Sequence, residues 1–251
     1  SFDRTMPEEI NRMVTDSVSD FLFVTEPSGV KNLRTEGVPM EKIFMVGDVM
    51  IDTLIENLKR IRSGRIQHPL KNPRGDYAVL TLHRPVNVDV KKTLSEIIDA
   101  LLEISRNIPI LFPAHPRTVK NIKKFGFQKK FTPYQPSVSP AKGMIIMEPL
   151  GYLPFLALMS GARMALTDSG GIQEETTYLK VPCLTLRENT ERPITIELGT
   201  NILTGTDKEK IVTEARKILR GKAKKGKIPA LWDGKAAQRI VKMLEKNFNK
   251  K

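Results

Sequence analysis

Five short apolar segments, each followed by a helix-like segment, constrain the fold more than any other feature of this sequence. They are YAVLTL, IPILFPA, MIIMEP, RMALT and PCLTLR, which begin at residues 77, 108, 144, 163 and 182. They do not show the alternation of apolar and polar residues that marks a strand with one solvent-facing side. Apolar strands separated by helices are typical of a parallel sheet that helices cover on both faces. The sequence therefore predicts an α/β fold built on a parallel sheet.

The first 64 residues repeat this rhythm in a shorter form. An amphipathic helix is followed by two short strands, FLFVT and KIFMVGD, and a further helix follows each strand. This pattern indicates the end of a second parallel-sheet domain. The segment at 65–76, RIQHPLKNPRGD, is rich in proline, glycine and charge, as linkers are. We expect three parts: a domain remnant at 1–64, a Rossmann-like domain at 76–240 and a basic tail at 241–251.

Length and composition are those of a globular protein. Of the 251 residues, 40% are hydrophobic and 27% are charged. No apolar run approaches the roughly 20 residues that span a bilayer, and the first residues show no signal-peptide pattern. The lone cysteine, Cys183, lies in the apolar run VPCLTL and has no disulfide partner. We interpret it as a buried strand residue rather than a catalytic thiol, and we expect a cytoplasmic protein with no membrane partner.

The positive charge is concentrated at one end of the chain. The net charge is +13, and residues 208–251 carry fifteen basic and four acidic residues, a balance of +11. Basic stretches such as GKAKKGK contain no interleaved aromatic residues and match no nucleic-acid-binding module. We therefore interpret this region as a solvated basic face and expect no nucleic-acid partner.

Polar residues follow three of the expected strands directly. His83 and Arg84 follow YAVLTL, His115 follows IPILFPA, and Asp168 with Ser169 follows RMALT. In an open parallel sheet, ligands bind outside the carboxyl ends of the strands. His83 and Arg84 can contact a diphosphate, although a strand-end histidine can also be purely structural, and the same applies to His115.

The turn Ser169-Gly170-Gly171 opens the helix that follows RMALT. Glycines allow a backbone to approach a ligand closely, and helix N-termini attract phosphate, but many such turns use glycine for steric reasons alone. Glu174 and Glu175 either cap this helix or bind a ribose diol. The combination points to a nucleotide.

Two further residues allow both a structural and a functional interpretation. Thr5 and Glu8 form a capping box, which explains Glu8 without any catalytic role. The pattern around Phe155 favours a core position over a base-stacking one.

Six stretches together amount to a family signature. They are DRTMPEEINR at 3–12, VGDVMIDTL at 46–54, LTLHRPVNVD at 80–89, PLGYLPFLALM at 149–159, LTDSGGIQEET at 166–176 and KVPCLTLRENTERPIT at 180–195. In order and spacing they closely resemble the non-hydrolysing UDP-N-acetylglucosamine 2-epimerases. The resemblance implies a GT-B-like pair of Rossmann-like domains. It also implies interconversion of UDP-N-acetylglucosamine and UDP-N-acetylmannosamine by elimination and re-addition of UDP through a 2-acetamidoglucal, with no cofactor and no metal.

The resemblance also implies residue roles. Ser169, Gly170 and Gly171 correspond to the diphosphate loop, Glu175 to the ribose-binding carboxylate, and Phe155 to the residue beside uracil. In the same way His83 corresponds to the active-site histidine near the diphosphate. Glu8 corresponds to a carboxylate that handles protons, and Arg192 to a further residue of the cleft.

In one respect the sequence departs from the family. Members carry a longer N-terminal region, with an arginine-containing glycine loop and two further catalytic acids, before the stretch that resembles residues 3–12. We therefore expect this chain to be a fragment that does not epimerise by itself. The expected partners are a UDP-sugar and a second copy of the chain, in cell-surface polysaccharide biosynthesis. The alternatives are a GT-B glycosyltransferase and a non-catalytic module for UDP binding or dimerisation.

Overall fold

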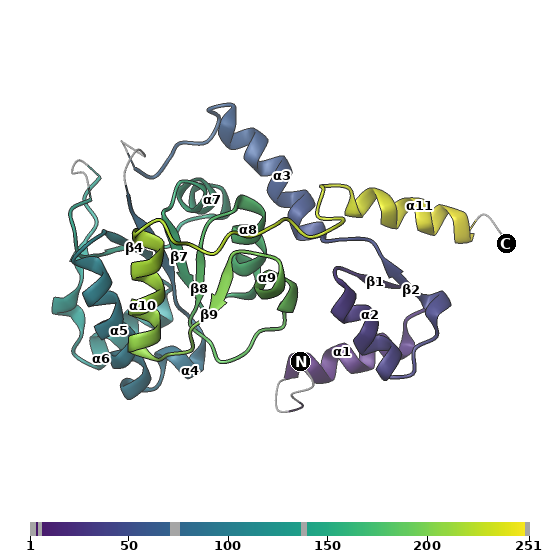
Figure 1. Cartoon of the computed structure of the whole chain (residues 1–251), viewed down its shortest axis with the longest axis horizontal. Helices are drawn as coiled ribbons and strands as arrows, with labels where there is room; N and C mark the ends of the chain where they lie inside the picture. Colours follow the sequence, from purple (N-terminus) through teal and green to yellow (C-terminus); the bar gives the residue numbers. More distant parts are fainter. Residues whose placement is uncertain (1–3, 5–6, 71–75, 137–139, 249–251) are drawn as a thin grey trace. The chain divides into compact units, whose positions relative to one another are not determined.

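The computed structural model describes Arg4 and residues 7–70, 76–136 and 140–248 of the chain. The chain forms two compact units (Figure 1). The larger unit comprises Asn57–Ile228, and the smaller comprises Ser1–Glu56 together with Pro229–Lys251. Each unit is described below by itself.

The larger unit is built on one parallel sheet of seven strands, in the order β5-β6-β4-β3-β7-β8-β9. The strands are β3 (Ala78–Thr81), β4 (Ile110–Pro113), β5 (Thr132–Pro133), β6 (Met144–Met147), β7 (Met164–Thr167), β8 (Cys183–Thr185) and β9 (Asn201–Leu203). All their pairings are parallel. The prediction of an α/β fold with a parallel sheet is confirmed.

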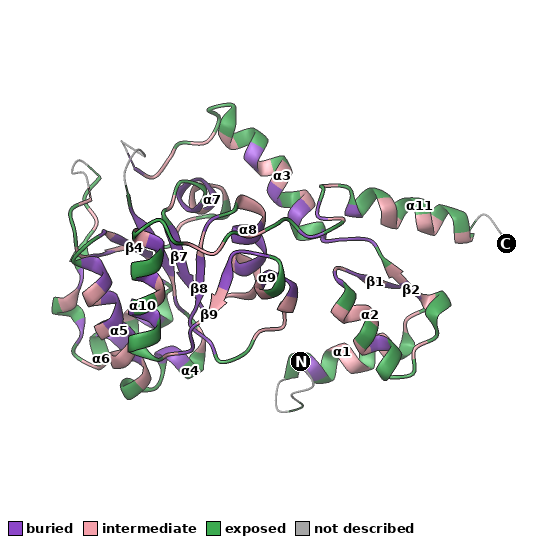
Figure 2. Ribbon diagram, viewed as in Figure 1, coloured by how far each residue is buried: buried purple, intermediate pink, exposed green. Residues whose placement is uncertain are grey.

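Helices cover both faces of this sheet because its strands are apolar on both sides. On one face, Leu80 of β3 packs in a core with residues of α5 (Lys91–Ser105), α6 (Pro116–Lys124) and α10 (Lys208–Leu219). On the other face, Val79 packs with Leu158 of α7 (Tyr152–Ser160). Figure 2 shows β7 and β8 as buried, which agrees with their apolar sequences. The lack of polar alternation in these segments is thus explained by burial of both side-chain rows.

The strand order reverses at β3, in the middle of the sheet. The chain leaves β3 toward β4, and after β6 it crosses back to place β7 on the other side of β3. The carboxyl ends of β3 and β7 lie side by side, with Thr81 paired to Thr167. Such a reversal leaves a crevice at the carboxyl ends of the two strands, which is the usual ligand position in open α/β sheets.

The smaller unit contains a short parallel pair, β1 (Leu22–Val24) and β2 (Ile43–Met45). Its helices are α1 (Pro7–Val18), α2 (Pro27–Thr35), the first part of α3 (Val49–Arg62) and α11 (Ala236–Phe248), with a short 3-10 helix at Met40–Lys42. Asp52 of α3 accepts hydrogen bonds from the first two amides of α11, Ala236 N at 3.1 Å and Ala237 N at 2.7 Å. This carboxylate explains how a segment more than 180 residues away in sequence is held in the same unit.

Some details differ from the sequence-based expectations. The edge strand β5 and two short helices, α4 (Pro85–Val88) and α9 (Pro193–Glu197), were not expected from the sequence. Residues 241–248, which lie within the expected basic tail, form the end of α11. The boundaries of the compact units also differ from the expected domain ranges, which remain a prediction. Among the described residues, no helix is both long and apolar enough to cross a membrane.

Candidate functional site

Asp168 is the central residue of the polar cluster at the strand reversal. It follows β7 directly and is fully buried. Its carboxylate accepts hydrogen bonds from His83 N at 3.1 Å, from Arg84 N at 2.8 Å and from Asn87 Nδ2 at 3.2 Å. The Nδ1 atom of His83 lies 3.0 Å from Asp168 Oδ1. A buried carboxylate requires such a set of donors, and here they all come from the segment that follows β3.

Further hydrogen bonds tie the two strand ends together. The hydroxyls of Thr81 and Thr167 lie 2.6 Å apart, and Ser169 N donates to the Thr167 hydroxyl at 2.9 Å. The Arg84 Nε donates to the carbonyl oxygen of Asp168 at 3.0 Å. The polar residues that end β3 and β7 therefore form one rigid junction.

The Nδ1 atom of His83 faces the buried Asp168, whereas 48% of the His83 side-chain surface is exposed. An ionised carboxylate only accepts hydrogen bonds, so Nδ1 of His83 carries the proton that faces Asp168. Nε2 is then the nitrogen that can exchange a proton with a ligand. The structure thus gives His83 the geometry of an acid-base group oriented by a buried aspartate.

The two charges of this pair stabilise each other. The hydrogen bond to Asp168 raises the pKa of His83, against the opposing effects of burial and of the nearby Arg84. Burial by itself raises the pKa of Asp168, but the hydrogen bonds from His83 and Arg84 outweigh it and hold the pKa below its usual value. The pair is therefore charged over a wider pH range than either residue would be in water.

Asp168→Asn is expected to lower the pKa of His83 and to remove the pH dependence that the pair gives to stability. In the native protein, the contribution from His83 is complete below its usual pKa of 6.5 and is lost as the pH rises through the raised pKa. The contribution from Asp168 is present above 3.8 and is lost as the pH falls through the lowered pKa. Titration of the His83 ring protons by NMR measures the first effect. A His83 pKa that is unchanged in Asp168→Asn would show that the two side chains are not coupled.

The first turn of α8 (Gly170–Leu179) lies beside this junction. Ser169 is its N-cap residue, but the Ser169 side chain makes no capping hydrogen bond. A Cβ atom built on Gly170 or Gly171 meets no described atom within 4 Å, and neither residue has a positive φ. Neither local packing nor backbone strain therefore requires these two glycines. A ligand that approaches the backbone closely does account for them.

The structure distinguishes the two adjacent glutamates of α8. Both are 3% exposed. Glu174 forms an ion pair with the Nε atom of Arg192, whereas Glu175 accepts a hydrogen bond from the Tyr152 hydroxyl at 2.9 Å. The acidic pair is thus not a helix cap, because neither residue lies in the first turn, and each carboxylate has its own partner.

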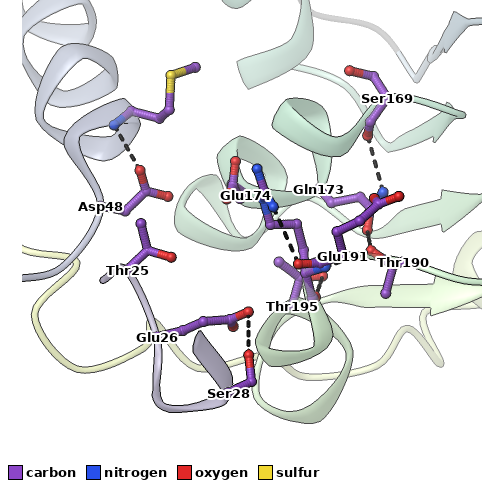
Figure 3. Close-up of polar contacts among 12 residues, drawn as sticks. Thr25, Glu26, Ser28, Asp48, Ser169, Gln173, Glu174, Thr190, Glu191 and Thr195 are labelled. Carbon is purple, nitrogen blue, oxygen red and sulfur yellow. Dashed lines mark hydrogen bonds and ion pairs between the residues drawn. The ribbon is translucent and has the colours of Figure 1, made fainter. Parts of the chain in front are cut away.

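A residue that the sequence analysis missed, Gln173, fixes the loop at 186–192. Its side-chain oxygen accepts hydrogen bonds from Thr190 at 2.6 Å and Asn201 at 3.1 Å, and its nitrogen donates to Ser169 O at 3.2 Å. Figure 3 shows Gln173 between Ser169 and Thr190. This loop follows β8, which pairs with β7 on the side away from β3. The loop therefore lies at the same end of the sheet as the strand reversal. The sequence did not identify Gln173 as a site residue, because nothing in the pattern of a helix shows that one of its glutamines is fully buried.

The same loop carries a strong ion pair. Arg187, which is buried, donates to Glu191 at 2.6 and 2.8 Å. This pairing lowers the pKa of Glu191 to about 2 although the side chain is half-buried. The pair stiffens the segment that carries Arg192, the cleft residue expected from the resemblance.

The remaining expected site residues occupy less polar or separate positions. Phe155 is partly buried and packs against the cluster that contains Tyr77 and Val79. Glu8 lies on α1 of the smaller unit and is exposed, whereas Glu9 beside it is buried and bound to Arg12 at 2.7 Å. Thr5, the other half of the expected capping box, lies outside the described residues.

Two other expectations concern residues with polar or reactive side chains. His115 caps α6 by accepting a hydrogen bond from Arg117 N at 3.2 Å. Cys183 is completely buried in β8, and burial raises the pKa of its thiol to about 11. Such a thiol is not nucleophilic at neutral pH, as expected for a structural strand residue. No cluster of potential metal ligands occurs in the described part of the chain.

Comparison with known proteins identifies the family. The family model described as UDP-N-acetylglucosamine 2-epimerase matches residues 1–245. The UDP-N-acetylglucosamine 2-epimerase of Methanocaldococcus jannaschii is 44% identical over 249 residues, which are 97% of this chain and 66% of that protein. The UDP-2,3-diacetamido-2,3-dideoxy-D-glucuronate 2-epimerase of Pseudomonas aeruginosa is 36% identical and matches 98% of this chain and 65% of that protein.

A solved structure agrees with the sequence comparisons. The crystal structure of the Methanocaldococcus jannaschii UDP-GlcNAc 2-epimerase in complex with UDP-GlcNAc and UDP superposes with a TM-score of 0.82 at 43% identity. The match covers 98% of this chain and 66% of that chain, so this chain spans slightly less than two thirds of its relative. The expected GT-B-like fold class is confirmed by this likeness. Since the family match extends over nearly all of the sequence, this chain belongs to the UDP-N-acetylglucosamine 2-epimerase family.

Proposed function

We propose that the whole protein interconverts UDP-N-acetylglucosamine and UDP-N-acetylmannosamine. The higher identity to the Methanocaldococcus jannaschii enzyme than to the diacetamido-glucuronate epimerase supports this choice of sugar. The observation that carries the proposal is the bare first turn of α8, where Gly170 and Gly171 have no steric reason to be glycine.

In this proposal the diphosphate of the substrate lies against the amides that follow Ser169. Two cationic groups are close to that turn, since Arg84 is bonded to the Asp168 carbonyl and Arg192 is paired with Glu174. A diphosphate in this position gains from the amides, from the helix dipole and from guanidinium groups that match its oxygens. Glu175 receives the ribose hydroxyls, and Phe155 lies beside uracil.

The proposed chemistry is an elimination followed by an addition. A base removes the C2 proton, the C–H electron pair forms the C1–C2 double bond, and the C1–O bond breaks so that UDP leaves with its electrons. A proton then adds to C2 from the opposite face while a UDP oxygen attacks C1. The C2 proton is weakly acidic, so stabilisation of the departing diphosphate must lower much of the barrier.

His83 and Glu8 are the proposed catalytic groups. The raised pKa of His83 favours the protonated ring, which can donate to the leaving diphosphate oxygen and take the proton back on re-addition. Glu8 is proposed to exchange the proton at C2, which its exposed position permits. The reaction is redox-neutral overall, so the proposal contains no nicotinamide cofactor.

We also propose that the whole protein is a homodimer of the cytoplasm that supplies cell-surface polysaccharide synthesis. The supporting observations are the substrate class and the lone buried cysteine, which suits a reducing compartment. Light scattering during size-exclusion chromatography tests the oligomeric state.

Incubation of the whole protein with UDP-N-acetylglucosamine in D2O, without any acceptor, tests the proposed reaction. We expect the manno epimer to form with one solvent deuterium at C2, because the transferred proton comes from solvent-exchanging groups. Calorimetry with residues 1–251 tests the binding step separately. Turnover that requires an acceptor sugar, or epimer that retains the original C2 hydrogen, would contradict the mechanism.

A further inference from the structure

The hydroxyl of Tyr152 is hydrogen-bonded to Glu175, the carboxylate that the proposed function assigns to the ribose. Tyr152 is the first residue of α7, and its hydroxyl donates to Glu175 Oε1 at 2.9 Å. Glu175 lies on α8, and α7 and α8 pack against each other in the larger unit. Tyr152 is 40% exposed, whereas Glu175 is only 3% exposed. A half-exposed phenol therefore contacts a carboxylate that solvent scarcely reaches.

The direction of this hydrogen bond is settled by charge. Burial of the hydroxyl, followed by the charge of Glu175, raises the pKa of Tyr152 well above its usual value. The phenol stays protonated at neutral pH, so Tyr152 is the donor and the Glu175 carboxylate is the acceptor. A buried carboxylate that loses a donor pays a large desolvation penalty, so this hydrogen bond stabilises the buried Glu175 carboxylate.

A ribose diol offers the same chemistry as the phenol: a neutral hydroxyl that donates to a carboxylate. With 3% of its surface exposed, Glu175 cannot receive the two ribose hydroxyls unless a neighbouring group moves. Tyr152 is suited to move because it is the first residue of its helix and is 40% exposed.

We propose that Tyr152 is a positioning residue that takes the place of the ribose when no nucleotide is bound. Its hydroxyl then holds the Glu175 carboxylate, and the ribose hydroxyls displace it when the nucleotide binds. This inference rests on the proposed UDP site. Binding of a ribonucleotide exchanges one hydroxyl-carboxylate bond for another. Tyr152 thereby weakens the binding of UDP and helps its release, while it provides a hydrogen-bond donor to the Glu175 carboxylate between turnovers.

Tyr152→Phe tests this exchange by calorimetry on residues 1–251, with UDP and 2′,3′-dideoxy-UDP as probes. Removing the competing donor is expected to tighten UDP binding about tenfold, the effect of one hydrogen bond to a charged group. Dideoxy-UDP has no hydroxyl for Glu175, so its Kd should change less than twofold. The Kd for dideoxy-UDP divided by the Kd for UDP should therefore rise about tenfold. A general effect on folding would not change this ratio.

Three controls accompany this variant. Tyr134→Phe removes another tyrosine hydroxyl of the same unit, which donates to Pro69 O at 2.8 Å, and should leave both Kd values unchanged. If Tyr152→Phe folds poorly, Tyr152→Leu replaces it and should show the same gain in UDP affinity. Glu175→Gln, introduced into the Tyr152→Phe protein, should remove most of the preference for UDP over dideoxy-UDP.

The outcomes separate the inference from the function on which it rests. If UDP binds and Glu175→Gln abolishes the preference for ribose, but Tyr152→Phe leaves the ratio unchanged or lowers it, the displacement is wrong and the UDP site stands. If Tyr152→Phe, which lacks the competing donor, also binds UDP and dideoxy-UDP equally, Glu175 does not hold the ribose, and both the proposed site and the role of Tyr152 are overturned.

Discussion

His83→Asn in the whole protein is expected to lower kcat by about 10²- to 10⁴-fold, the usual contribution of a general acid or base. The asparagine amide can still donate to Asp168, as the Nδ1 proton does at 3.0 Å, so the junction between β3 and β7 is kept. What is lost is the second ring nitrogen, which we assign to proton exchange with the diphosphate. The measurement is the initial rate of epimerisation, together with the Kd of UDP.

The expected pattern is a large loss in kcat with a Kd for UDP within a few-fold of wild type. His68→Asn is the matched control, because His68 lies between the expected domains and its Nδ1 accepts a hydrogen bond from Leu70 N at 3.0 Å, which an asparagine oxygen can also accept. That variant should keep full activity. If His83→Asn retains kcat within threefold, His83 has no acid-base role.

Gly171→Ala is expected to weaken UDP binding by roughly 5- to 160-fold while leaving the fold intact. The added methyl group meets no described protein atom within 4 Å, so the folded state gains no clash. Alanine is also a better helix former than glycine by roughly 0.5 to 1 kcal/mol. The methyl does enter the space where the diphosphate must approach the backbone, and overpacking there costs about 1 to 3 kcal/mol. Calorimetry and thermal unfolding measure the two effects.

Gly199→Ala provides the opposite case. A Cβ atom there would lie 2.3 Å from the Thr177 hydroxyl and 2.5 Å from Thr195 O, so α8 and α9 would have to separate. We expect a loss of about 1 to 3 kcal/mol in the free energy of unfolding of the larger unit, with UDP affinity kept in the folded protein. If Gly171→Ala behaves in the same way as Gly199→Ala, the glycine turn is structural and the proposed diphosphate site is wrong.

Most of the architecture could be predicted because it depends on patterns that are local in sequence. Strands such as β3 and β7 are short apolar runs that end in polar residues, and helices such as α5 repeat apolar residues at helical spacing. The rule that ligands bind at the carboxyl ends of parallel strands then placed His83 and Ser169 at one edge. The edge strand β5 escaped prediction because its two residues, Thr132 and Pro133, carry too little pattern to differ from a loop.

The details of the site could not be predicted in the same way. Nothing in the sequence shows that Asp168 is fully buried, that Asn87 reaches it from another strand end, or that Gln173 bonds to Thr190. The two adjacent glutamates look equivalent in sequence, yet Glu174 pairs with Arg192 and Glu175 with Tyr152. These partners lie between 17 and 81 residues apart along the chain, beyond the reach of any helical or strand periodicity.

The sequence by itself determined the parallel sheet, the edge at which its polar residues gather and the family to which the chain is related. Hydrophobic burial and local spacing are enough for that, since they act on each segment separately. The tertiary structure alone decided which carboxylate orients His83, which glutamate meets a hydroxyl donor and which glycines face open space. Those choices depend on hydrogen bonds between strand ends that only the strand order β4-β3-β7-β8 brings together.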